Sequence, residues 1–187
     1  MFNYEEKETK VGYLDINGLI DAEYLNCDKN LLHLDILVLS ETKLEITTET
    51  NIVKDRLSNW KVAARFDSDK GKKNMGLILL LNKNSKKSNN AHSVTHHKIY
   101  RNSVLQAQMM IVTIFNNEQY GFIYCRSTPN SNELKALDQL FSSCSIILGD
   151  LNLSHRISEE LSKLKKLCAS EKISVLNEII RTSSNNQ

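Results

Sequence analysis

The sequence has little proline and glycine and no long apolar run. Its 187 residues include one proline and six glycines, which excludes collagen-like chains and low-complexity chains rich in these residues. The longest apolar runs, such as 76–81, are far shorter than the ~18–20 residues of a membrane-spanning helix. Segment 1–10 is polar and charged and lacks the apolar part of a secretory signal. We therefore expect an intracellular protein that is neither secreted nor held in a membrane.

Motifs for several common chemistries are also absent. The four cysteines are widely scattered: Cys27, Cys125, Cys144 and Cys168. They form no CxxC pair, which argues against a zinc site and favours reduced, mostly buried thiols. The sequence contains no GxGxxG, GxxxxGK[ST], HExxH or GxSxG motif. His96 and His97 are neighbours in an expected strand and would point to opposite faces, so they do not favour a shared metal.

Composition favours one globular domain spanning 1–187. Hydrophobic residues make up 41% and charged residues 25% of the chain, both near the globular average. The net charge is +2, but segment 61–90 has eight Lys and Arg against two Asp, a charge of +6 that leaves −4 for the rest. This basic segment fits either a solvated surface or a contact with a phosphate backbone.

Short apolar runs alternate with amphipathic stretches, which is typical of α/β proteins. The runs 34–40, 60–64, 75–81 and 145–149 lack polar alternation and predict strands buried on both faces. Further strands are expected at 10–16, 104–114 and 119–125, the last two as a hairpin. Apolar spacing predicts helices at 20–32, 132–141 and 157–172.

Acid-bearing turns follow three of the expected strands. They contain Asp15 and Asn17, then Glu41, then Asp150 and Asn152. Strand ends in an α/β core bring distant side chains to one rim, and carboxylates gathered there repel one another unless a cation lies between them. Oxygen ligands of this kind suit Mg²⁺. Each residue taken singly is also an ordinary turn residue.

Five segments, in order, resemble motifs of one superfamily. They are DINGL at 15–19, LDILVLSETKL at 34–44, MGLILLLN at 75–82, FIYCRSTPN at 122–130 and IILGDLN at 146–152. Together they resemble the endonuclease/exonuclease/phosphatase superfamily, with its DNase I-like fold, and within it the apurinic/apyrimidinic endonuclease-like nucleases of retroelements. The resemblance covers the chain from residue 10 onward. It implies an α/β fold, a four-layer α/β/β/α sandwich of two facing mixed sheets.

The resemblance also implies a metal-dependent nuclease that hydrolyses phosphodiester bonds in DNA. Asp15 and Glu41 would hold Mg²⁺, or Mn²⁺ as an alternative. Asp15 stands where the family usually has asparagine. Asp150 and Asn152 would be catalytic, the first orienting the attacking water and the second holding the scissile phosphate.

Three further positions complete the implied site. Tyr124 would be catalytic through a contact with the phosphate, unless the following proline sets the alignment, in which case Ser127 takes that place. Asn17 would lie beside the metal and face the substrate. Lys72 and Lys73, in the basic segment, are the candidates for contacting the DNA backbone.

The chain departs from the family near its C-terminus. It has no counterpart of the family's late Ser-Asp-His segment, and none of its five histidines stands at that place. We therefore expect a domain that lacks its last strands and nicks DNA weakly or not at all. It would fit a fragment of a mobile-element polyprotein with a reverse transcriptase or helicase, nuclear in a eukaryote.

Three other interpretations stay open. The chain could be a phosphatase of the same superfamily, acting on a small phosphoester. It could be a non-catalytic remnant that binds DNA by charge alone, or an unrelated α/β domain with coincidental motifs. The oligomeric state does not follow from the sequence.

Overall fold

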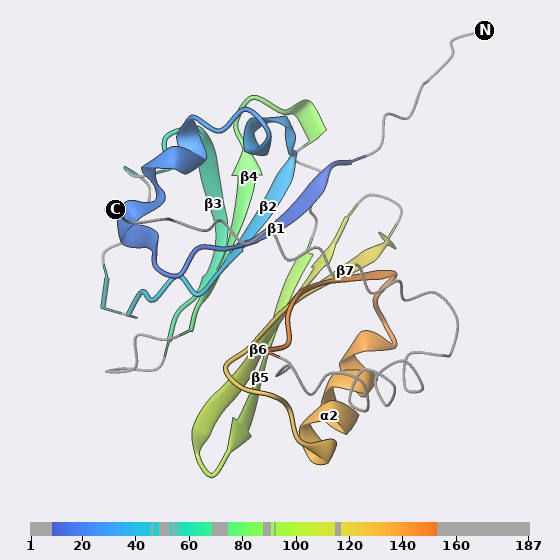
Figure 1. Cartoon of the computed structure of the whole chain (residues 1–187). Coiled ribbons are helices and arrows are strands. Elements are labelled where there is room, and N and C mark those ends of the chain that lie inside the picture. Colours follow the sequence, from blue (N-terminus) through green and yellow to red (C-terminus); the bar gives the residue numbers. More distant parts are fainter. Residues whose placement is uncertain are drawn as a thin grey trace, which may run out of the picture.

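The computed structural model describes residues 9–45, 47–48, 53, 55, 57–68, 75–87, 91, 93–114 and 117–152, with side chains throughout except at 20–23. Two four-stranded sheets face each other (Figure 1). No helix within these residues is long and apolar enough to cross a membrane.

The first sheet has the strand order β1-β2-β4-β3. Its strands are β1 (Val11–Asp15), β2 (Ile36–Ser40), β3 (Trp60–Phe66) and β4 (Leu77–Asn82). β1 is parallel to β2, and the other two pairings are antiparallel. Every residue of the central strands β2 and β4 is buried, because both of their faces are covered. A continuous aliphatic run can be accommodated only in such a position.

The second sheet has the order β5-β6-β7-β8. Its strands are β5 (Ser93–Arg101), β6 (Val104–Thr113), β7 (Gln119–Cys125) and β8 (Ile146–Asp150). β5, β6 and β7 form antiparallel hairpins, and β8 joins β7 in parallel. The β5–β6 turn uses two residues with positive φ, Asn102 at 49° and Ser103 at 61°. Two successive left-handed residues match the twist of a tight hairpin.

Three apolar layers hold the sandwich together. The middle layer contains Val38 and Leu79 from the first sheet and Met110 and Phe122 from the second. The outer face of the first sheet packs on residues of the 3-10 helices η1 (Leu19–Asn26) and η2 (Leu31–His33).

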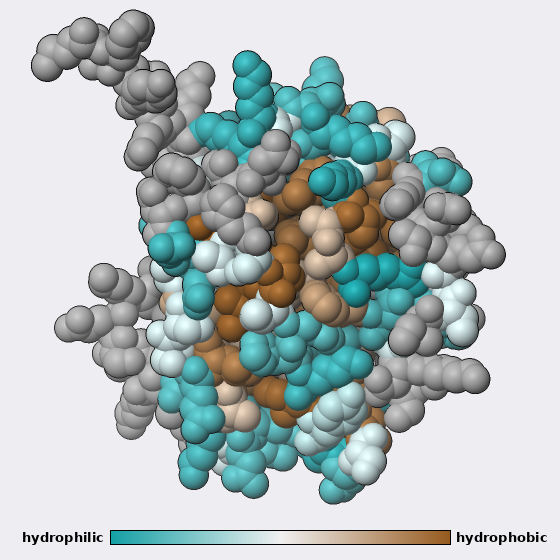
Figure 2. Space-filling model, turned by 180° about the vertical axis from the view of Figure 1, so that it is seen from behind, coloured by the Kyte–Doolittle hydropathy of each residue, from teal (hydrophilic) through white to brown (hydrophobic). Residues whose placement is uncertain are grey.

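Among the described residues, one helix covers the outer face of the second sheet. α2 (Ser131–Phe141) lies beside this sheet (Figure 1), and its Leu137 and Phe141 belong to the apolar layer between them. The order of layers is therefore helix, sheet, sheet, helix, which is the α/β/β/α sandwich that the family resemblance implies. Seen from behind, apolar residues form a band between hydrophilic ones, so part of the apolar layers reaches the surface there (Figure 2).

Most of the predicted strands and the helix at 132–141 are confirmed, but two burial predictions are wrong. In β3 only Trp60 is buried and the other residues are half-buried or exposed, and β8 is half-buried or exposed along its length, because both are edge strands. The predicted helix at 20–32 is two short 3-10 helices. The predicted helix at 157–172 lies outside the described residues. Among the described cysteines, Cys125 is buried, Cys144 is half-buried and Cys27 is exposed.

Candidate functional site

Strand ends from both sheets meet at one end of the sandwich. Asp15 is the last residue of β1 and lies level with Ser40, the last residue of β2. Asp150 is the last residue of β8 and lies level with Tyr124 of β7. The edge strands β1 and β8 contact each other. Two parallel strand pairs, one from each sheet, therefore end at the same rim, where functional residues of α/β proteins commonly gather.

A hydrogen bond joins the two sheets across this rim. The Tyr124 hydroxyl donates to Oε1 of Glu41, the residue that directly follows β2. Burial raises the pKa of Tyr124 well above its usual range, and the charges of Glu41, Asp15 and Asp150 raise it further. The hydroxyl therefore stays protonated at neutral pH and acts as a donor.

The carboxylates of the rim influence one another. The pKa of Asp15 is raised to about 6, first by burial, then by the negative charge of Glu41 and, more weakly, by that of Asp150. The backbone N–H of Asn17 donates to Asp15 Oδ1 at 3.1 Å and partly opposes this shift. Three acidic side chains thus share one electrostatic environment, which a bound cation would stabilise.

The two acidic strand ends continue into the same kind of turn. Asn17 follows Asp15 and has a φ of 48°, and Asn152 follows Asp150 and has a φ of 47°. In the second turn, the backbone N–H of Asn152 donates to Asp150 Oδ1 at 2.7 Å. Asparagine tolerates the left-handed conformation better than most residues, so these Asp-x-Asn turns hold each carboxylate against a following backbone amide.

The side chain of Asn152 is fixed by the neighbouring strand. Its Nδ2 donates to the backbone carbonyl of Cys125 at 2.6 Å, and the backbone carbonyl of Asn152 accepts from Thr128 Oγ1 at 2.8 Å. The carboxamide carries a second N–H on Nδ2. The turn is therefore built to hold Asn152 in one orientation.

Lys43 is a site residue that our sequence interpretation missed. Its Nζ donates to Asn17 Oδ1 and lies 4.0 Å from Glu41 Oε2. Glu41 and Lys43 both have left-handed backbones, with φ of 49° and 54°. Such conformations are costly for these residue types and concentrate at functional sites. The signal in the sequence was a basic residue two positions after the acidic one, within the SETK turn.

The acidic residues supply the kind of oxygen donors that a divalent cation with few protein ligands would use. Within the described part of the chain, no group of three or more His, Cys, Asp and Glu side chains could together hold a metal ion. Mg²⁺, however, commonly uses one or two carboxylates and keeps several waters. Asp15 and Glu41 supply two carboxylates, and the charge of Glu41 raises the pKa of Asp15, as expected for oxygens that a cation would stabilise.

The structure brings together six of the residues that the sequence singled out: Asp15, Asn17, Glu41, Tyr124, Asp150 and Asn152. The alternative to Tyr124, Ser127, donates from Oγ to Gln106 Oε1 at 3.0 Å. Lys72 and Lys73 lie outside the described residues.

Neither family models nor curated proteins match the sequence. Solved structures do match the fold. A mutant of the Neisseria 3′ phosphatase NExo, bound to a product DNA hairpin, aligns over 79% of this chain and 59% of its own, with 15% identity and a TM-score of 0.52. A mutant Cimex nitrophorin in its ferrous NO complex aligns over 86% of this chain and 68% of its own, with 13% identity and a TM-score of 0.51.

An AP endonuclease from Archaeoglobus fulgidus aligns over 94% of this chain and 80% of its own, with 13% identity and a TM-score of 0.49. This chain spans 45% of an AP endonuclease from Leishmania major and 59% of the Neisseria protein. At such low identity the likeness shows the DNase I-like α/β sandwich and nothing finer. Because a phosphatase and a nitrophorin share this fold, the fold does not select a function, and the site has to be argued from its own residues.

Proposed function

We propose that this chain hydrolyses phosphodiester bonds in DNA with the help of a divalent metal ion, as an endonuclease. One observation carries the proposal: the Tyr124 hydroxyl contacts Glu41 across the two sheets, at a rim that also holds Asp15 and Asp150. A phosphodiester is an anion, so its hydrolysis is helped by a bound cation and by neutral hydrogen-bond donors. The carboxylates of the rim could hold the cation, and the protonated Tyr124 hydroxyl is such a donor.

Each residue has a role in this proposal. Asp15 and Glu41 would hold Mg²⁺, or Mn²⁺ in its place, and the bound ion would stabilise charge on the phosphoryl oxygens. Asp150 would orient the attacking water and accept its proton. The second N–H of the Asn152 amide would donate to the phosphate, and Tyr124 would do so once its single hydroxyl proton turns from Glu41 to the bound substrate. Lys43, which already contacts Asn17 and lies near Glu41, adds a fixed positive charge at the same rim.

The choice of DNA as substrate rests on the sequence motifs and on the charge of one segment. Segment 61–90 carries +6, and neutralising phosphates with such side chains favours nucleic acid by counterion release. The described members of this set are Lys61, Arg65, Lys83, Lys86 and Lys87. Lys61 lies level with Leu81, at the end of the first sheet opposite Ser40 and the rim, and Lys83, Lys86 and Lys87 follow β4 at that same far end. Arg65 is paired with Asp67. Lys72 and Lys73 stay candidates for the DNA contact. A mobile-element origin, with a polyprotein carrying a reverse transcriptase or helicase, is a narrower proposal that rests on the sequence motifs alone.

Nicking of supercoiled plasmid under enzyme excess tests the proposal. We expect weak, Mg²⁺-dependent conversion to the open circle, abolished by EDTA and reduced at least about 100-fold by Glu41→Gln, since metal stabilisation of the transition state is worth several kcal/mol. Glu118→Gln is the matched control, because Glu118 is exposed at the opposite end of β7 from Tyr124. Nicking that persists unchanged in Glu41→Gln would refute the assigned site.

A phosphatase is the second candidate, because the aligned Neisseria protein is a 3′ phosphatase. A 3′-phosphorylated oligonucleotide, tested beside the plasmid, separates the two activities. Release of phosphate without nicking would favour the phosphatase. Salt-dependent DNA binding that is unaffected by Glu41→Gln, with neither activity, would favour a non-catalytic binder.

A further inference from the structure

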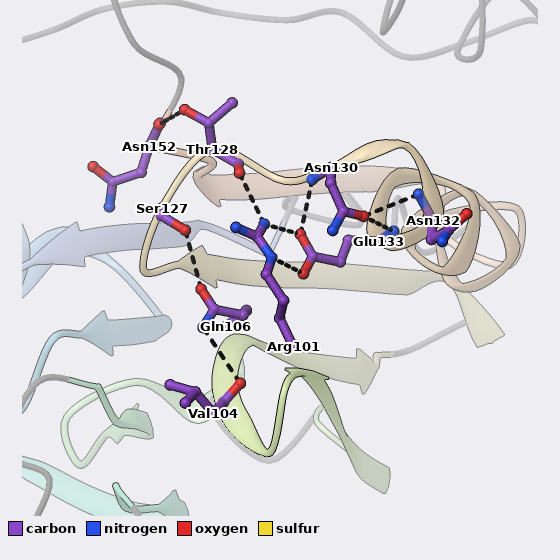
Figure 3. Close-up of polar contacts among 9 residues, drawn as sticks. All are labelled: Arg101, Val104, Gln106, Ser127, Thr128, Asn130, Asn132, Glu133 and Asn152. Atoms are coloured by element: carbon purple, nitrogen blue, oxygen red, sulfur yellow. Dashed lines mark hydrogen bonds and ion pairs between the residues drawn. The ribbon is translucent and has the colours of Figure 1, made fainter.

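A polar network lies beside the candidate site, between the β5–β6 hairpin and the start of α2 (Figure 3). Arg101, the last residue of β5, binds the Glu133 carboxylate through Nε at 2.8 Å and through Nη2 at 2.5 Å. The same Nη2 donates to the backbone carbonyl of Thr128 at 3.2 Å. One guanidinium therefore holds both the first turn of α2 and the loop that precedes it.

The other end of this loop is held by a helix cap. Asn130 accepts hydrogen bonds from the backbone N–H groups of Asn132 and Glu133, both at 3.0 Å, and its own N–H donates to Glu133 Oε2 at 2.8 Å. Glu133 is only 6% exposed. Arg101 is the largest cause that lowers the pKa of Glu133. A buried carboxylate with a two-point guanidinium partner is a rigid unit, whereas a single-point partner leaves it freer to move.

The network continues into the Asp150–Asn152 turn through Thr128. Its carbonyl accepts from Arg101, and its hydroxyl donates to the carbonyl of Asn152 at 2.8 Å (Figure 3). Asn152 in turn reaches back to Cys125, at the start of the same loop. The left-handed backbone of Asn152 is therefore tied to the loop at two points, and conformations of this kind persist only where their surroundings hold them.

We propose that Arg101 and Thr128 are positioning residues that fix the Asp150–Asn152 turn, with Arg101 acting through the carbonyl of Thr128 and Thr128 acting through its hydroxyl. The expected effect on hydrolysis rests on the proposed function. That Arg101 and Thr128 hold the turn does not depend on the proposed function, and it is measured separately.

The first measurement is amide hydrogen exchange at Asn152, whose N–H donates to Asp150. Thr128→Val keeps the shape of the side chain and removes its hydroxyl, while Thr128→Ser keeps the hydroxyl. We expect exchange at Asn152 about tenfold faster in Thr128→Val, as for the loss of one hydrogen bond, and near the wild-type rate in Thr128→Ser. Arg101→Lys keeps the charge but loses the two-point geometry, and should also accelerate this exchange.

Arg65→Lys is the matched control. Arg65 also pairs with a carboxylate, that of Asp67 at 2.6 Å, and donates to two backbone carbonyls, but it lies on β3 of the other sheet. The Arg65→Lys substitution should leave amide exchange at Asn152 unchanged. Unchanged exchange in Thr128→Val, or equal acceleration in Arg65→Lys, would overturn the inference, since the second result would mean general loosening of the fold.

The second measurement is plasmid nicking under single turnover. Thr128→Val should slow the step about 10- to 100-fold, as for a small misplacement of reacting groups, with DNA affinity unchanged and the rate restored in Thr128→Ser. A rate that Thr128→Ser fails to restore would overturn the assignment of the hydroxyl. If the wild type does not nick at all, the proposed function fails by itself, while the exchange measurements still decide whether Arg101 and Thr128 fix the turn.

Discussion

Replacing Gly149 by alanine should destabilise the protein far more than the same change at Gly18. Gly149 lies in β8 directly before Asp150 and has a φ of +153°. A Cβ added there would lie 1.9 Å from the carbonyl oxygen and 2.8 Å from the carbonyl carbon of Ile123, in β7. Close carbon–oxygen contacts in proteins are about 3.3–3.6 Å, so β8 would have to move away from β7 by more than about 1 Å. Backbone hydrogen bonds do not survive such an extension.

Gly18 separates the steric cost from the conformational one. It also has a left-handed φ, +120°, but its added Cβ would meet only Lys43 Cδ, at an ordinary 3.8 Å. Both alanine variants gain the same rigidity in the unfolded chain and share a backbone cost of about 1–2 kcal/mol. Overpacking should add about 1–3 kcal/mol at Gly149 alone.

Urea denaturation of both variants at 25 °C measures the difference. We expect Gly149→Ala to lose at least about 1 kcal/mol more than Gly18→Ala, the lower bound of the overpacking cost. Amides of β8 should lose exchange protection first, because β8 is an edge strand and can detach locally. Equal stabilities within about 0.5 kcal/mol would refute the close approach of β8 to β7.

Three further predictions concern the core, the site and pH. Leu79→Ala should lower the free energy of unfolding in urea by about 2–5 kcal/mol, since Leu79 is fully buried between the sheets; a loss well below this would contradict that placement. Tyr124→Phe should lower the free energy of unfolding by about 1–3 kcal/mol. In a double-mutant cycle measured by thermal melting, its effect and that of Glu41→Gln should not add, because the two groups bond directly. His96 stacks on Phe66 with ring centroids 3.9 Å apart, and burial lowers its pKa from 6.5 to about 4. The unfolded chain therefore binds this proton more readily, so stability should fall as pH drops from 6.5 to 4, and His96→Phe should flatten that part of a stability–pH curve.

The central strands could be predicted because their sequences permit few alternatives. The runs in β2 and β4 are aliphatic at nearly every position, so neither face can meet water, and both strands have to lie inside a sandwich. The equally apolar β8 gave a wrong prediction of burial. Its position at the edge of the second sheet follows from long-range pairing, which no local pattern encodes.

The candidate site shows the same division. The sequence pointed to Asp15, Glu41 and Asp150 because strand ends collect polar residues at one rim. Carboxylates gathered there repel one another unless a cation lies between them, which indicates a site. Lys43 was missed although it stands in the same turn as Glu41, because the direction of its side chain depends on a left-handed backbone. Arg101 and Glu133 lie 32 positions apart in the chain, and they meet only because a hairpin end and a helix start dock on the same loop.

The sequence by itself determined the class of fold and the residue types at the rim, because apolar periodicity and strand-end chemistry are local properties. The tertiary structure decided which strands lie at the edges, which side chains contact one another across the sheets, and which residues hold the turns. These depend on the order of strands in each sheet and on how the two sheets face each other. Both are set by contacts between residues far apart in the chain, whose free energy exists only once the whole sandwich has formed.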